Sequence, residues 1–296
     1  MGVQLNLFLD SRAVTLANEV IDALSARDAV GAAVSLDRLQ REAPDHPALP
    51  ALETLAGALA GWRKPDADPA AIVGAVQWLD TKIAPAAGQA LGPAAQAFVG
   101  GFFRDLADAA RGLAYEPARA TAHLAWLCLR CGEWADAEEA ARAIPGSTQN
   151  PDALHWLCLA RYRRDGLAAA RSSLFALAWY APQRLPSVLA ELGDELISRD
   201  WWAFERAREW DSVDEAELPA WFPAWYLLEH PVVGKELSDA AFPDTPPANA
   251  ARLLVELVEL ERQGNQQKLV GQREQLRRLN PDFFSLYMSR RAVQYL

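Results

Sequence analysis

The chain has 296 residues, of which 51% are hydrophobic and 23% are charged. These fractions are ordinary for a globular protein and favour a chain that folds around a core over one that is mainly disordered. The formal net charge of -10 argues against a nucleic-acid-binding body, because phosphate binding needs positively charged faces. No segment approaches the ~18 consecutive apolar residues that span a bilayer, so no membrane segment is expected.

The cysteine count and the start of the chain bear on its compartment. Three cysteines are too few for a disulfide framework. The first residues lack the basic region and the long apolar region of a secretory signal. We therefore expect a cytoplasmic protein.

The predicted elements are almost all helices. Residues Val3–Leu9 form the only strand-like alternation, and Asp10–Ser11 after them is the expected start of the first helix. From Val14 onward, apolar residues recur at spacings of three and four, which indicates amphipathic helices. Prolines and glycines divide this material into pieces of about 12 to 20 residues, the length of single helices in hairpins.

Two stretches rich in proline and polar residues are the best candidates for linkers, namely 63–69 and 242–247. They divide the chain into three predicted segments. These are an N-terminal helical hairpin region at 1–62, a central helical array at 70–240 and a C-terminal basic helical hairpin at 248–296.

An internal repeat lies in the central segment. The sequence Leu-Ala-Trp-Leu-Cys-Leu at 124–129 matches Leu-His-Trp-Leu-Cys-Leu at 154–159 in five of six positions, at an offset of 30 residues. Each copy is followed by a polar break and then by a second, alanine-rich helix. This arrangement predicts a helix-turn-helix motif repeated in tandem.

The spacing of residues before certain prolines resembles that of tetratricopeptide repeats, in which a small residue lies where two helices cross and a proline closes the repeat. Two repeats share spacings of 12, 8 and 5 residues, and two more depart from the pattern. The members are Ala170, Leu174, Leu177 and Pro182; Ala32, Leu36, Leu39 and Pro44; Leu269, Arg273, Leu276 and Pro281, with leucine at the small position; and Gly132, Trp134, Ala137 and Ile144, with an early Pro145.

The resemblance implies an all-α, right-handed α-solenoid of helical hairpins that binds a protein partner along its concave surface. The alternative is an irregular helical bundle with accidental periodicity. In the repeat closed by Pro182, the resemblance turns one face of the first helix toward the partner. The residues expected to bind the partner there are His155, Leu159, Tyr162 and Arg163.

Five of the eleven tryptophans lie between Trp201 and Trp225. Core packing would account for them, because large rings fill irregular gaps between short helices. As a functional alternative, Trp221 and Trp225 are candidate exposed anchors for a partner, since tryptophan is frequent at interface hot spots. A second class of function remains open, in which the chain is a helical enzyme or a small-ligand sensor. Its pocket would be lined by Trp201, Trp210 and Trp225.

Residues 262–296 carry seven basic and two acidic side chains, a local net charge of +5 against -15 for the rest of the chain. A solvated helix face would account for this charge. Alternatively, Arg277 and Arg278 bind an acidic surface, on a partner or on a second copy of the chain.

Patterns typical of catalysis are missing from the sequence, which contains no nucleophile elbow, phosphate-binding glycine loop or zinc-protease motif. Cys128 and Cys131 form a Cys-x-x-Cys pair that could bind zinc together with Cys158 and a histidine, His123 or His155. However, Cys128 and Cys158 occupy equivalent positions in the repeat, which favours packing. We therefore expect no enzyme, cofactor or metal site.

Two further features have structural interpretations. Gly100 and Gly101 indicate the close approach of another helix. Glu138 and Glu139 are expected on a solvated face, as are the acidic residues at 211–217.

Overall fold

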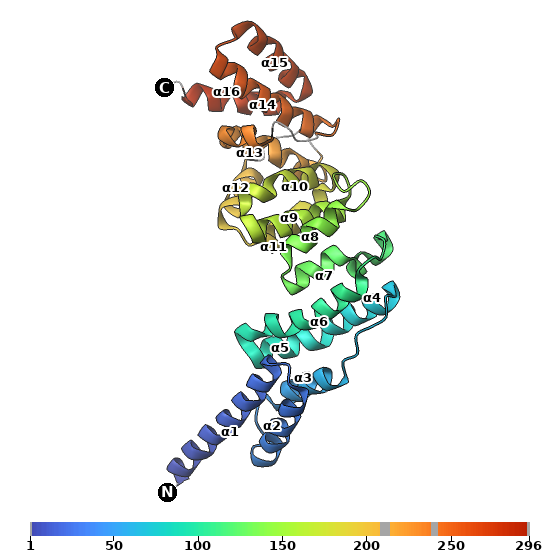
Figure 1. Ribbon diagram of the computed structural model, residues 1–296. Helices are drawn as coiled ribbons and strands as arrows, with labels where there is room; N and C mark the ends of the chain where they lie inside the picture. Colours follow the sequence, from blue (N-terminus) through green and yellow to red (C-terminus); the bar gives the residue numbers. More distant parts are fainter. Residues whose placement is uncertain (1, 208–213, 238–241, 295–296) are drawn as a thin grey trace. The chain divides into compact units, whose positions relative to one another are not determined.

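The computed structural model describes residues 2–207, 214–237 and 242–294, and this part of the chain consists of helices joined by short turns (Figure 1). It contains no strand within those ranges. The all-α class is therefore confirmed. Trp210 and residues 211–213 lie outside the described residues. Among the described helices, none combines the length and the apolar character that crossing a membrane requires.

The strand-like start was predicted wrongly. Helix α1 (Gly2–Ser25) runs through Val3–Leu9 without interruption, and Asp10–Ser11 lies inside it rather than at its start. The physical reason is that Leu5, Phe8 and Leu9 also have the three- and four-residue spacing of a helix, and no proline interrupts them. Over so few residues, the two periodicities cannot be told apart.

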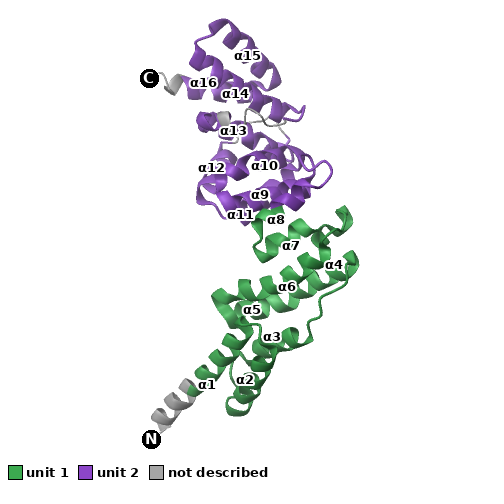
Figure 2. Ribbon diagram, in the orientation of Figure 1, with its two compact units in different colours: residues 1–137 green, residues 138–296 purple. Residues whose placement is uncertain are grey.

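The chain forms two compact units, residues 1–137 and 138–296 (Figure 2). Their boundary falls within helix α8 (Trp134–Arg142), inside the predicted central segment 70–240. In the first unit, α1 pairs with α2, α3 packs against α2 and α5, and α6 packs against α5 and α7. A π-helical turn at Leu79–Ile83 joins α4 to α5. The remaining helices of this unit are α2 (Ala29–Glu42), α3 (Leu49–Gly61), α4 (Pro69–Trp78), α5 (Ala84–Leu91), α6 (Ala95–Ala110) and α7 (Leu124–Cys131).

In the second unit, successive helices also pair. Helix α9 packs against α10, α13 lies between α12 and α14, and α15 contacts both α14 and α16. The helices are α9 (Pro151–Asp165), α10 (Leu167–Tyr180), α11 (Leu185–Leu192), α12 (Glu195–Arg206), α13 (Phe222–Glu229), α14 (Pro246–Gln263), α15 (Gln266–Leu279) and α16 (Pro281–Gln294).

Three of the four prolines predicted to close repeats directly follow the end of a helix, whereas Pro145 lies three residues beyond the end of α8. Helices α2, α10 and α15 each stop just before an X-Pro step, at Ala43, Ala181 and Asn280. In each case this residue has left the helical region, while its N–H still donates to the carbonyl four residues earlier. A residue before proline avoids the helical conformation, because the proline ring would clash with it. The three identical endings explain the regular spacing seen in the sequence.

The predicted helix-crossing positions are buried. Ala32 and Ala170 are both fully inaccessible to solvent, and so are Leu174 and Leu177 on α10. Arg273, which stands where the pattern expects an apolar residue, is half-buried and donates to the hydroxyl oxygen of Tyr287 at 3.1 Å. The arginine that departs from the repeat pattern therefore has a polar partner inside the unit.

Replacing Ala170 by tryptophan is expected to lower the free energy of unfolding by about 1–3 kcal/mol, because α9 and α10 leave no room for a ring at this position. Ala168 on the same helix is exposed and gives the matched control, Ala168→Trp. Urea unfolding measures both. Equal stability of the two variants would show that Ala170 does not lie at a helix crossing.

The paired glycines do permit close packing. A Cβ atom on Gly101 would overlap the guanidinium group of Arg27, which lies over the ring of Phe102 at 4.5 Å. On Gly100, a Cβ atom would be 3.7 Å from the Cα atom of Cys131, so α6 approaches the end of α7 closely. The predicted approach of another helix is therefore seen at Gly100, at an ordinary van der Waals distance, whereas the close neighbour of Gly101 is the side chain of Arg27.

Candidate functional site

The four residues predicted on the concave side of α9 are used inside the second unit. Leu159 is buried at 5% exposure. The Nε2 atom of His155 lies 2.7 Å from a carboxylate oxygen of Glu191, and Arg163 donates to the carbonyl oxygen of the same residue at 3.3 Å. Tyr162 donates its hydroxyl to Asp194 at 3.1 Å.

The burial of Leu159 corrects its assignment to a partner-binding surface, while His155 and Tyr162 are half-buried and Arg163 is exposed, so their binding of a partner stays a prediction. Glu191 belongs to α11 and Asp194 caps α12, so this face of α9 is the one that the following helices cover. The spacing from Pro182 correctly predicts that these residues share one face of α9. The sequence does not show which neighbour covers it.

Three of the tryptophans in the tryptophan-rich segment, Trp201, Trp221 and Trp225, belong to the core. Trp221 and Trp225 are each 3% exposed, which corrects their assignment as exposed anchors. Phe222 lies between them in sequence, and its ring centroid is 6.3 Å from that of Trp225 and 5.3 Å from that of Trp201. The rings of Trp201 and Trp225 thus pack around another aromatic side chain. Trp210, the third wall of the predicted pocket, lies outside the described residues.

Most of the positive charge near the C-terminus is paired within the second unit. Glu261, whose side chain is 11% exposed, contacts Arg273 at 3.3 Å and Arg291 at 2.9 Å. Two more pairs are Arg290–Glu229 at 2.7 Å and Arg278–Glu274 at 3.1 Å. The segment is therefore not the free basic face that its net charge suggested. Arg277 and Arg278 are exposed on α15, and their role in docking stays a prediction.

A groove of about 580 Å³ lies along α14, and sequence reasoning missed it. Its apolar lining comes from Phe242, Val255 and Leu260. Phe242 is held in place by Trp179 of α10, with 5.0 Å between ring centroids. Apolar residues at 253–255, 257, 258 and 260 cover more of α14 than one buried face requires, and this excess was the available signal.

The rim of this groove carries both signs of charge. Along α14, Arg252 is followed by Glu256 and Glu259, which gives a cation and two carboxylates on one helix face. From α15, Gln272 donates to Glu256 at 2.7 Å, and Lys268 also lines the groove. The groove thus has an apolar floor and a polarised rim.

A second pocket, of about 450 Å³, lies within the first unit between α6 and the end of α7. Cys131 lines it and is half-buried. Two guanidinium groups flank it, each paired with a carboxylate: Arg104 with Glu133 at 2.9 Å, and Arg130 with Asp80 at 2.6 Å. The rest of the lining consists of Pro93, Gln96, Ala97 and Gly100.

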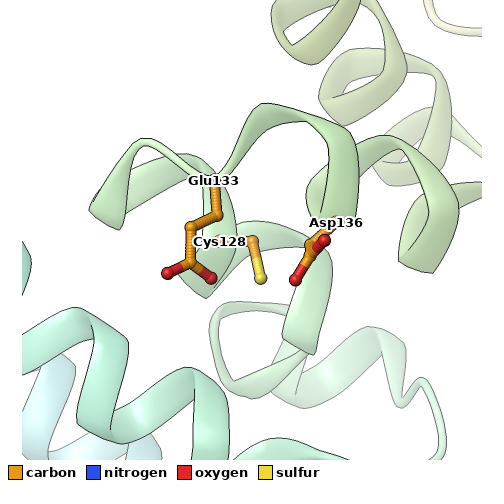
Figure 3. A group of neighbouring side chains, drawn as sticks. All are labelled: Cys128, Glu133 and Asp136. Atoms are coloured by element: carbon orange, nitrogen blue, oxygen red, sulfur yellow. The ribbon is translucent and has the colours of Figure 1, made fainter.

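In the same unit, the sulfur of Cys128 lies between two carboxylates (Figure 3). The Sγ atom and one carboxylate oxygen each from Glu133 and Asp136 are within 4.8 Å of one another. A divalent cation here would compete with guanidinium groups already in place, since Arg104 pairs with Glu133 and Arg111 lies 3.7 Å from Asp136. The pKa of Cys128 is raised by its hydrogen bond to Cys131 and by burial, so its thiol stays protonated, whereas metals bind the thiolate. We therefore assign no metal site to this group.

Comparison with known protein families, with curated proteins and with solved structures found no match to the chain.

Proposed function

We propose that the protein is a cytoplasmic interaction module, a tetratricopeptide-like stack of helical hairpins that binds an amphipathic helix of a partner protein. The observation that carries the proposal is the groove along α14, with its apolar floor and charged rim. The tandem hairpins and their buried crossing alanines support the repeat architecture. The three cysteines are free thiols, which suits a reducing compartment.

The groove has the dimensions of a short helix. From Arg252 to Leu260 the floor follows α14 for about 12 Å, or roughly two helical turns. A helix lying in such a groove inserts apolar side chains at spacings of three and four residues. A volume of about 580 Å³ accommodates a few such side chains without rearrangement of the walls.

The rim selects the polarity of the occupant. A partner helix should carry a basic residue opposite Glu256 and Glu259, and an acidic residue opposite Arg252. Because these charges lie at the edge of the groove, they set orientation and specificity more than affinity. The apolar floor supplies most of the binding free energy.

The variant Val255→Glu places a charge in the floor of the groove and should weaken binding of a helix at least about tenfold, or about 1.4 kcal/mol. The probe is a set of amphipathic helical peptides selected by phage display on the wild-type chain, with affinities measured by fluorescence polarisation. Val270→Glu is the matched control, since Val270 lies on α15, is 67% exposed and does not line the groove.

Circular dichroism first establishes that both variants retain the wild-type melting temperature. Glu259→Lys should then shift the selected peptides toward acidic residues at one end. The proposal is wrong if no helical peptide is selected, or if Val255→Glu and Val270→Glu change affinity equally.

A further inference from the structure

The two copies of the Trp-Leu-Cys-Leu repeat differ at one informative position. Cys128 and Cys158 are equivalent, and both are fully buried, as expected of small side chains that fill space between helices. Three residues after each, the first copy has Cys131 and the second has Arg161. The position is therefore not required to hold a small buried residue. Packing accounts for Cys128, and it does not account for Cys131.

Cys131 lies close to Cys128 and is partly exposed to solvent. Its sulfur lies 3.4 Å from the carbonyl oxygen of Cys128, one helical turn earlier. Residues three apart in a helix have Cα atoms about 5 Å apart, which is within the range that a disulfide bridges. Cys131 lines the pocket of about 450 Å³ and is half-buried, whereas Cys128 is inaccessible to solvent.

The surroundings of Cys131 favour its thiolate. A hydrogen bond from the Cys128 thiol lowers the pKa of Cys131, and the backbone N–H of Glu133 and the charge of Arg104 act in the same direction. Burial and the Glu133 carboxylate oppose them without reversing the shift. By contrast, burial raises the pKa of Cys158 to about 12. Since the thiolate is the nucleophile, Cys131 is expected to react before Cys158.

We propose that Cys131 is an oxidation site for hydroperoxides and that Cys128 is its resolving thiol. This site lies in the first unit and is independent of the groove along α14. The Cys131 sulfur attacks one oxygen of the peroxide, forming an S–O bond and breaking the O–O bond, and the leaving oxygen takes up a proton. The product on the chain is a sulfenic acid.

The second step closes the disulfide. The Cys128 sulfur attacks the Cys131 sulfur, so that an S–S bond forms and the S–O bond breaks, and the hydroxide leaves as water with the Cys128 proton. The two sulfurs together lose two electrons, and the peroxide gains two. The accessible thiol reacts first and the buried thiol only afterwards.

The test uses the reduced full chain with hydrogen peroxide, followed by mass spectrometry of the intact chain and of its peptides. We expect the loss of two hydrogen atoms, a disulfide between Cys128 and Cys131, and an unmodified Cys158, which serves as the control within the same chain. Cys131→Ser should slow the peroxide-dependent loss of thiols at least about tenfold. These measurements on the wild-type chain do not depend on any variant folding.

Iodoacetamide gives an independent measurement. Cys131 should be alkylated with a half-maximal pH below that of the denatured chain, because its thiolate is favoured only in the folded state. The proposal is overturned if Cys158 is oxidised as fast as Cys131, if no Cys128–Cys131 disulfide forms, or if both thiols react only after a chelator has removed a bound metal.

Discussion

Replacing Phe222 by alanine is expected to destabilise the second unit by about 4 kcal/mol, the cost typical of deleting a buried aromatic ring. Phe222 is fully inaccessible to solvent, and four rings surround it with centroid distances of 5.3 to 6.3 Å. These rings belong to Trp201, Phe204, Trp225 and Tyr226. Their edges and faces cannot close over the vacated volume without moving α12 against α13, so a cavity would remain.

Trp202 provides the control for this prediction. It lies next to Trp201 on α12 but is 62% exposed, so Trp202→Ala should change the free energy of unfolding by less than about 0.5 kcal/mol. Urea unfolding followed by circular dichroism measures both variants. If these aromatic side chains formed an exposed binding surface instead of a core, Phe222→Ala would change the free energy of unfolding as little as Trp202→Ala.

The helices and their ends could be predicted because both depend on local chemistry. Apolar spacing and X-Pro steps act within a few residues, and the endings at Ala43, Ala181 and Asn280 follow from the proline that comes next. The burial of Ala170 was predictable for the same reason, since the repeat fixes its place on the helix. The segment at Val3–Leu9 was misassigned because two periodicities coincide there, and the predicted linker 242–247 extends two residues into α14.

The surfaces could not be predicted, because exposure depends on which neighbours cover a face. The face of α9 with Tyr162 is identifiable from spacing, yet its cover comes from α11 and the residue that caps α12. Net charge is similarly ambiguous. The sequence suggests that the basic C-terminal residues are unpaired, whereas in the structure Glu229 and Glu261, from other helices of the same unit, pair with three of them. The groove could not be predicted either, because its lining combines Phe242 with residues of both α14 and α15.

Glu138 shows the same limit most clearly, because it was expected on a solvated face and is instead buried at 2% exposure. It accepts a hydrogen bond from Arg161 at 2.8 Å and pairs with Arg164 at 2.6 Å and with Arg142. Arg161 also donates to the hydroxyl of Ser173 at 2.6 Å. The Glu138 carboxylate thus joins α8 to α9, and Arg161 extends the connection to Ser173 on α10.

Replacing Glu138 by alanine should destabilise the second unit by about 3 kcal/mol, since Arg161 keeps its charge in a largely buried position without a carboxylate. The other two arginines are more exposed and regain water, so the loss stays near the lower end for a broken buried pair. Glu139→Ala is the matched control on the exposed side of the same helix and should be nearly neutral. Equal effects of the two substitutions on urea unfolding would contradict the prediction.

The same ion pairs predict a pH dependence. Burial acts to raise the pKa of Glu138, but the hydrogen bond from Arg161 and the three positive charges outweigh it, so the folded-state pKa lies below the ordinary value of 4.5. A lowered folded-state pKa stabilises the fold fully above the ordinary pKa, and this contribution is lost as the pH falls through the folded-state value. The stability difference between the wild type and Glu138→Ala should therefore be constant well above pH 4.5 and shrink on further acidification. A difference that stayed the same through acidification would show that the lost packing of the side chain, rather than its charge, causes the effect.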